Sequence, residues 1–172
     1  MKDEISDHVR ALRRYALVLT RNGDEAEDLV QEALTRALNG AHLFSPERDL
    51  RVWLFSILHN AHVSRMRRRR VARRAEARMD RDAVQPAGQA VHMELRQALD
   101  CLDRLPDDQR RAVALVALES LSYAEASKVL GIPMGTLMSR LARGREALRR
   151  MTDGAAPTAA QASEAPPRRA RR

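Results

Sequence analysis

The sequence predicts an all-α protein of two small helical domains joined by a flexible linker, with a helix-turn-helix in the second domain. Aromatic residues make up only 3% of the 172 residues, and glycine and proline are sparse. The extended β-branched runs that are typical of strands are absent. Leu, Val, Ala and Ile must therefore build the cores, and they recur at the spacing of amphipathic helices.

The first domain, residues 1–78, is expected to contain three helices. Apolar residues at helical spacing predict the first helix over about residues 4–20. Residues 24–27 have the pattern of a capping box that opens a second helix, and Asn39-Gly40 is a typical stop signal. Three polar side chains lie opposite the apolar stripe of this second helix: Asp28, Gln31 and Glu32.

A third helix is expected after residues 45–47. Leu54 and Leu58 belong to its core stripe, whereas Val52 and Phe55 fall on the opposite side. This arrangement predicts a helix that is covered on two faces. Beyond its apolar part, arginines surround the helix on all sides: Arg65, Arg67, Arg68, Arg69, Arg70, Arg73 and Arg74.

The rest of the chain divides into a linker, a second domain and a tail. Residues 79–93 combine weak periodicity with proline and glycine, which predicts a flexible linker. Residues 94–152 form the second helical domain. Residues 153–172 are mostly Ala, Pro, Ser and Thr and end in arginines, so we expect a disordered basic tail.

The most specific local signal is a helix-turn-helix. Ser122 and Glu125 form a capping box, Gly131 permits a sharp turn, and Pro133 can begin the next helix. Leu137 and its partners at helical spacing give that next helix an apolar back. Its front is polar and basic, which suits insertion into a major groove; the alternative is an αα-hairpin with a solvated basic face. The front residues are Gly135, Thr136, Ser139, Arg140 and Arg143.

Charge and composition restrict the function. The formal net charge of +8 favours a polyanionic partner, either nucleic acid or an anionic membrane. Codon bias accounts for arginine in place of lysine, but not for where the arginines cluster. The single cysteine, Cys101, excludes an internal disulfide framework, and the histidines form no zinc pattern with it.

The sequence also lacks the marks of an enzyme or a membrane protein. It contains no glycine-rich phosphate loop or nucleophile elbow, so we expect no catalysis, no cofactor and no metal. The N-terminus is acidic and unlike a signal peptide, and no apolar run approaches the roughly 18 residues of a membrane span. We expect a cytoplasmic protein without membrane insertion.

Four sequence blocks resemble extracytoplasmic-function (ECF) sigma factors, in the order in which that family has them. Residues 24–32 resemble the family's second conserved region, and residues 53–60 with the following arginines resemble its promoter-melting region. Residues 105–110 resemble the opening of the fourth region, and residues 122–140 resemble its helix-turn-helix. The resemblance covers about residues 8–150 and implies that the chain binds core RNA polymerase and promoter DNA.

The resemblance also implies roles for particular residues in the first domain. Asp28, Gln31 and Glu32 would contact polymerase; the alternative is a solvated acidic turn that favours the helix dipole. Asn60 would read a flipped minus-ten base, or else make a local helix contact. Trp53 would stack at the fork, or else lie in the core. The five arginines that would follow the DNA backbone are Arg65, Arg67, Arg68, Arg69 and Arg70.

In the second domain, the front of the helix-turn-helix would bind the minus-thirty-five element, and an anti-sigma factor would be a further partner. Two departures from the family affect promoter choice: Ser64 stands where an aspartate is common, and Met138 where a basic residue is common. One rival is a sigma-like module that titrates an anti-sigma factor without binding DNA. The other is an ordinary helix-turn-helix repressor.

Overall fold

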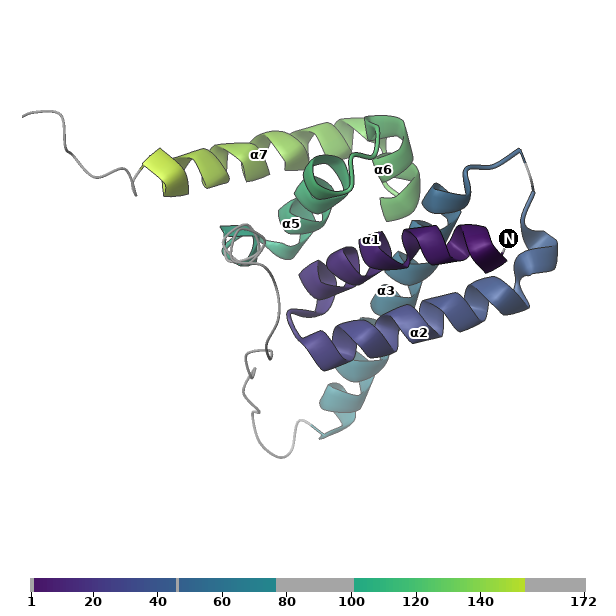
Figure 1. The fold of residues 1–172 in the computed structure, drawn as a ribbon. Helices are drawn as coiled ribbons and strands as arrows, with labels where there is room; N and C mark the ends of the chain where they lie inside the picture. Colours follow the sequence, from purple (N-terminus) through teal and green to yellow (C-terminus); the bar gives the residue numbers. More distant parts are fainter. Residues whose placement is uncertain (1, 46, 77–100, 154–172) are drawn as a thin grey trace, which may run out of the picture.

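The computed structural model describes residues 2–45, 47–76 and 101–153, and every regular element in these ranges is helical (Figure 1). The helices form two groups, one on each side of the gap in the description. The linker predicted for residues 79–93, the start of the second domain at residues 94–100 and all but the first residue of the predicted tail lie outside the described residues.

The first group contains α1 (Lys2–Thr20), α2 (Gly23–Asn39), the short 3₁₀ helix η1 (Ala41–Leu43) and α3 (Leu50–Glu76). The capping box predicted for residues 24–27 is wrong in its position. Asn22 is the N-cap of α2, and its side chain accepts a hydrogen bond from the Glu25 amide at 3.0 Å. Asparagine is a strong N-cap residue, so α2 begins at Gly23, and the acidic run lies inside its first turns.

The second group contains α5 (Asp107–Val113), the π-helical segment η2 (Ala114–Leu118), α6 (Tyr123–Leu130) and α7 (Met134–Asp153). The predicted capping box of α6 is confirmed, because Ser122 and Glu125 each accept from the other's backbone amide. Gly131 adopts φ +62°, the left-handed conformation that the sharp turn between α6 and α7 requires. α7 then begins directly after Pro133.

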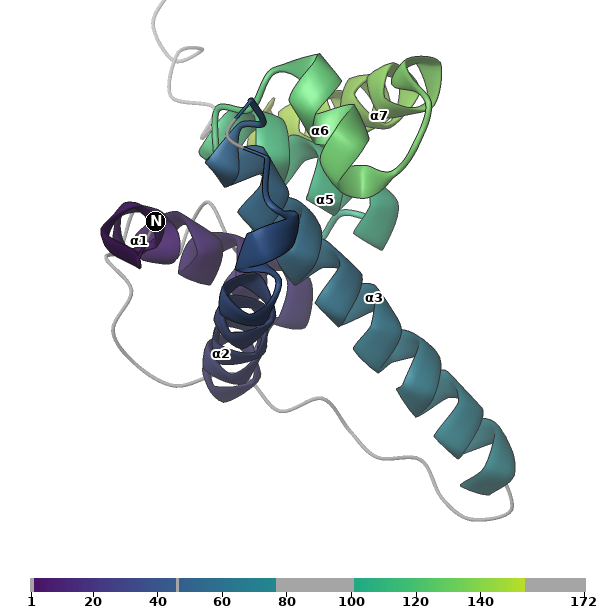
Figure 2. The ribbon, with the colours of Figure 1, turned by 90° about the vertical axis from the view of Figure 1, so that its right-hand side faces the viewer.

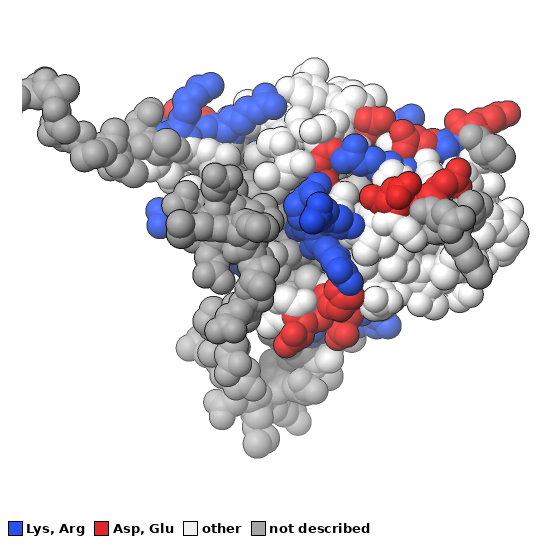
Figure 3. All heavy atoms as spheres, in the orientation of Figure 1, with Lys and Arg blue, Asp and Glu red and all other residues white. Residues whose placement is uncertain are grey.

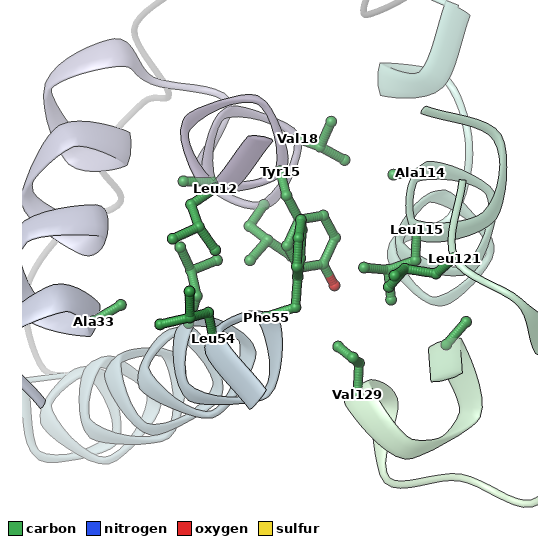
Figure 4. Packing of buried hydrophobic residues seen from close by; sticks show 14 of the residues in the cluster. Leu12, Tyr15, Val18, Ala33, Leu54, Phe55, Ala114, Leu115, Leu121 and Val129 are labelled. Carbon is green, nitrogen blue, oxygen red and sulfur yellow. The ribbon is translucent and has the colours of Figure 1, made fainter. Parts of the chain in front are cut away.

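The two groups share one buried apolar cluster. Leu54 of α3 faces α1 and α2, whereas Phe55 points toward the second group, where Leu115, Leu121 and Val129 lie (Figure 4). Phe55 is fully buried, so the prediction that α3 is covered on two faces is confirmed. The sequence predicted two bodies but not this contact between them.

The long helices α3 and α7 point in different directions. α7 lies across the top of the molecule in Figure 1. α3 runs away from α6 and α7, so that its arginine-rich end projects from the body (Figure 2). None of the helices in the described ranges is both long and apolar enough to cross a membrane.

A candidate nucleic-acid interface

The back of α7 is fixed against the second group. Leu137 and Leu141 are buried, as predicted for the apolar face. Gly144 lies where α7 approaches α5, because a Cβ atom at this position would be only 2.7 Å from Cγ2 of Val113. Only glycine allows this close approach, so α7 has one well-defined orientation and presents the opposite face outward.

The predicted front of α7 does lie on its outer side. Gly135, Ser139 and Arg143 are exposed, and Thr136 and Arg140 are half-buried. The Ser139 hydroxyl donates to the Thr136 carbonyl at 2.9 Å, so it is held along the helix. The five predicted front residues recur at spacings of three or four positions, which places them on one face of the helix.

Two features of this face were not predicted. Nε of Arg140 forms an ion pair with Oδ2 of Asp108 at 3.3 Å, so an acidic side chain from α5 stands beside the front of α7. Met134 and Met138 are exposed apolar side chains near the start of α7, with Met138 half exposed. In the sequence, Met138 stands out only as a departure from the family pattern.

The basic end of α3 divides into paired and unpaired arginines. Arg69 forms two hydrogen bonds with Glu25 of α2, at 3.1 and 2.9 Å, and these raise the pKa of Arg69. Arg65 and Arg68 both pair with Glu32 of α2. These ion pairs hold three of the five predicted arginines against the protein.

Arg67 and Arg70 differ from those three. Both are exposed, and neither forms an ion pair with an acidic side chain in the described ranges. Phosphate groups can reach these two guanidinium groups without displacing an internal partner. The five arginines form one cluster in the sequence. In the structure they fall into two sets: Arg67 and Arg70 have no such ion pair, whereas Arg65, Arg68 and Arg69 pair with α2.

The acidic-polar face of α2 is similarly divided. Asp28 and Gln31 are exposed, whereas Glu32 is half-buried and pairs with Arg36 as well as with Arg65. Gln31 donates to Glu27 at 3.0 Å, and this bond, together with one from Arg13, lowers the pKa of Glu27. Asp28 and Gln31 are therefore the two predicted residues of this face that are exposed.

Trp53 and Asn60 line the same pocket. Its volume is about 270 Å³, and the remaining lining residues are Arg36, Gly40, Leu43 and Ile57. Trp53 is half-buried and packs against the Phe44 ring at 5.0 Å between centroids, in a tilted arrangement. One face of the tryptophan is thus supported by the protein while part of the ring faces the pocket, so both of the roles considered for it are compatible with its position.

Charge on the outside of the molecule is unevenly distributed. On the face shown in Figure 3, basic side chains gather over the C-terminal half of α7, while acidic and basic side chains are mixed over α1 and α2. Arg149 and Arg150 in that half of α7 pair with Glu146 and are otherwise exposed. A packed helix with a polar-basic outer face, reached through a sharp turn, defines a DNA-binding protein of the helix-turn-helix class.

Comparisons with known proteins place the chain within that class. Residues 5–59 match the family model described as the sigma2 domain of PhyR, and residues 95–148 match the model for sigma-70, region 4. The ECF RNA polymerase sigma factor EcfG of Rhodopseudomonas palustris is 40% identical over 149 residues, which cover 86% of this chain and 82% of that protein. SigM of Mycobacterium tuberculosis, another ECF sigma factor, is 34% identical, over 84% and 72% of the two chains.

Solved structures agree with the sequence comparison. The sigma factor RpoE from Bartonella quintana, solved in complex with the anti-sigma factor NepR, has a TM-score of 0.76 and 32% identity, covering 88% of this chain and 96% of that one. The protein belongs to the ECF RNA polymerase sigma factors, and it directs promoter-specific transcription initiation by RNA polymerase.

Proposed function

We propose that the two helical groups divide promoter recognition between them. The first domain, residues 1–78, binds core polymerase and the minus-ten element, and the second, residues 94–152, binds the minus-thirty-five element. The observation that carries this proposal is the front of α7: Gly135, Ser139 and Arg143 face outward while Leu137 and Leu141 fix the back of the helix. Such a helix can enter a major groove without any change in its own packing.

Base recognition at the minus-thirty-five element falls to the N-terminal half of α7. Thr136 and Ser139 offer hydroxyl groups, and Arg140 offers a guanidinium group that can bind guanine in a bidentate manner. The backbone of Gly135 can approach DNA closely, because no atom lies within 4 Å of where its Cβ would be. Arg143 lies one turn further on and binds phosphate, which adds affinity but little sequence preference.

The pocket beside Asn60 is the proposed site for a flipped minus-ten base. The side-chain amide of Asn60 has both a donor and an acceptor, so it can pair with the edge of a base. Trp53, Leu43 and Ile57 supply apolar surface for the flat faces of that base. Next to this pocket, Arg67 and Arg70 follow the phosphates, with Arg65, Arg68 and Arg69 joining them only where DNA displaces their acidic partners.

Core polymerase is proposed to bind the exposed side of α2. Asp28 and Gln31 are exposed polar residues on this side. Glu32 supports these two residues indirectly. Its ion pair with Arg65 holds α3 against α2, and its ion pair with Arg36 lies within α2. In this proposal Glu32 positions the surface more than it contacts the partner.

Three further parts of the proposal follow from the family. The sigma factor acts without covalent chemistry and without a cofactor or metal, because the polymerase carries out catalysis. It works in the cytoplasm, where the polymerase and its promoters are. An anti-sigma factor regulates it, as the complex of the similar RpoE with NepR suggests.

One observation favours a second candidate function. The match of residues 5–59 is to the sigma2 domain of PhyR, and a PhyR fragment solved with NepR from Sphingomonas sp. Fr1 shares this fold, with a TM-score of 0.64 and 18% identity. A chain of this kind could titrate an anti-sigma factor without binding DNA. Such a module has no need for the exposed Arg143, Arg67 and Arg70, so the sigma-factor role is the better supported one.

Reconstituted transcription on genomic fragments tests the proposal. Purified protein added to core polymerase should start transcription at a subset of promoters, and Asn60→Ala should lower activity at those promoters while leaving binding to core polymerase unchanged. A protein that binds neither core polymerase nor promoter DNA in any partner context disproves the function. A protein that binds an anti-sigma factor but neither of these two partners supports the titration role instead.

A further inference from the structure

Glu119 is the charged centre of the contact between the two helical groups. Its side chain is only 1% exposed, and it follows η2 directly. Nε and Nη2 of Arg14 on α1 donate to its two carboxylate oxygens at 3.0 and 2.9 Å. Arg51 on α3 lies 3.6 Å from Oε2 and also donates to the Glu119 backbone carbonyl. One carboxylate of the second group thus binds arginines from two helices of the first.

A second polar contact joins the two groups at the end of α1. Arg110 of α5 is 2% exposed, and its Nε donates to the Val18 carbonyl at 3.0 Å. Val18 lies in the last turn of α1, where the carbonyl groups have no donor within the helix and attract positive charge. Arg21, just after α1, also pairs with Asp103 and Asp107 of the second group. The interface is therefore held by charged groups at both of these places in addition to the apolar cluster.

This closed arrangement is too small to reach both promoter elements. The following argument rests on the proposed function. Elements centred near positions minus ten and minus thirty-five are separated by about 25 base pairs, or roughly 85 Å at 3.4 Å per step. A compact body of about 130 residues is roughly 40 Å across, and α3 with its 27 residues is itself only about 40 Å long. The two groups must separate before each can occupy its own element.

We propose that Glu119, Arg14 and Arg51 form a clasp that holds the sigma factor closed, and that the clasp opens when polymerase and promoter DNA are engaged. A buried ion pair suits a reversible contact, because its Coulomb energy is largely offset by the hydration that its charges regain on opening. Arg14 and Arg51 are already about one-third exposed. They can return to water with little further rearrangement.

The clasp lowers the apparent affinity of the sigma factor for polymerase and promoter DNA. When only a fraction of the molecules is open, the apparent dissociation constant rises in inverse proportion to that fraction. Removing the Glu119 charge therefore increases the open fraction and strengthens productive engagement. Most variants of an ordinary structural contact would weaken activity, so this direction of change distinguishes a clasp from a purely structural ion pair.

The open fraction can be measured in the free protein, without polymerase or DNA. Spin labels at Arg10→Cys on α1 and Ala124→Cys on α6, with the exposed native thiol removed by Cys101→Ser, report the distance between the two groups. The protein with Glu119, Arg14 and Arg51 unchanged should give a single narrow distribution of short distances between the two labels. Glu119→Gln, which keeps the shape of the side chain, should shift a substantial part of it to longer distances.

Arg13→Gln is the matched control. Arg13 is the neighbour of Arg14 on α1, but it pairs with Glu27 inside the first group, and both side chains are about half exposed. Removing one positive charge at this position, the same change in charge as Arg51→Gln on α3, should leave the distance distribution closed. If Glu119→Gln fails to fold, Arg51→Gln removes the other side of the clasp from a partly exposed position and serves for the same measurement.

Transcription provides the second readout. With core polymerase limiting and a promoter that has both elements, Glu119→Gln should lower the sigma concentration for half-maximal transcription by about fivefold, the effect of roughly 1 kcal/mol. An unchanged distance distribution in Glu119→Gln and Arg51→Gln overturns the clasp, whatever the transcription result. If the unmodified protein is closed but inactive with core polymerase, the proposed function is overturned. The clasp is then judged from the distance measurements alone.

Discussion

Nε of Arg140 on α7 lies 3.3 Å from Oδ2 of Asp108 on α5, so the side chain best suited to read guanine is paired with an acid from the same helical group. Asp108→Asn should free this arginine and remove a negative charge beside the DNA. We expect tighter binding to all DNA sequences and a smaller preference for the cognate minus-thirty-five element. Titrations with cognate and scrambled duplexes check both effects.

The control for this variant is Asp7→Asn, at an exposed position of α1, which makes the same change in net charge outside the helix-turn-helix group. It should alter neither the affinity for scrambled DNA nor the preference for the cognate element. An equal gain in affinity from both variants would show that net charge alone, and not the Asp108 pair, is responsible.

The two glycines of α7 should respond oppositely to alanine. Gly144→Ala places a Cβ atom 2.7 Å from Val113, and such overpacking costs about 1–3 kcal/mol, which exceeds the roughly 1 kcal/mol that alanine gains in a helix. Gly135→Ala meets no atom within 4 Å and should stabilise the fold by up to about 1 kcal/mol. Urea unfolding midpoints measure both changes, and a loss of stability in both variants would contradict the packing argument.

Two buried histidines predict a loss of stability in mild acid. Burial lowers the pKa of His59 and of His62 to about 4, from the usual 6.5. The unfolded chain takes up these protons below about pH 6.5, and the folded chain does so only near pH 4. The contribution of these neutral imidazoles to the free energy of unfolding is therefore complete above pH 6.5. It is lost as the pH falls toward 4, by an amount on the order of 3 kcal/mol per imidazole.

Denaturant unfolding between pH 4.5 and 7.5 checks this dependence. His59→Gln should flatten the profile in that window, because it removes one titrating group. The glutamine amide retains a hydrogen-bonding group for the Tyr15 hydroxyl, which lies 3.1 Å from Nδ1 of His59. His42→Gln, at an exposed position in η1, should leave the slope unchanged. Acidic groups titrate equally in both variants, so the difference between the two profiles isolates the buried imidazole.

The arginines at the end of α3 should differ in their effect on DNA binding. Replacing Arg67 and Arg70 by glutamine should reduce the slope of log affinity against log salt by about two units, because each phosphate contact contributes roughly one. Replacing Arg65 and Arg69 should change the slope less and lower the melting temperature, since both pair with α2. Salt titrations of polymerase–promoter complexes and thermal melts of the free protein separate the two cases.

Local signals in the sequence were sufficient for much of the fold. Ser122 with Glu125, and Gly131 after them, correctly marked the helix-turn-helix because caps and left-handed turns depend on residues only a few positions apart. The double-sided burial of α3 followed from Val52 and Phe55 in the same way. The start of α2 was misplaced because two adjacent stretches, at Asn22 and at Asp24, both contain residues that can cap a helix.

The contact between the two groups was beyond such reasoning. Glu119 looks like a surface acid in the sequence, and its partners Arg14 and Arg51 lie 105 and 68 positions away. No periodicity connects residues at these separations. The division of the α3 arginines was missed for a related reason, because Glu25 and Glu32 were assigned to α2 alone and their reach to α3 depends on how the two helices pack.

The π-helical segment η2 sets the direction in which Glu119 points. Its wider turns are closed by bonds between residues five apart, including the one from the Glu119 amide to the Ala114 carbonyl at 3.1 Å. A π-turn accommodates one residue more than an α-turn. Wound as an ordinary α-helix, the same residues would turn the side chain of Glu119 by about 100° around the helix axis, away from Arg14 and Arg51. The winding of this short segment, and not the arginines alone, therefore decides whether the two halves adhere.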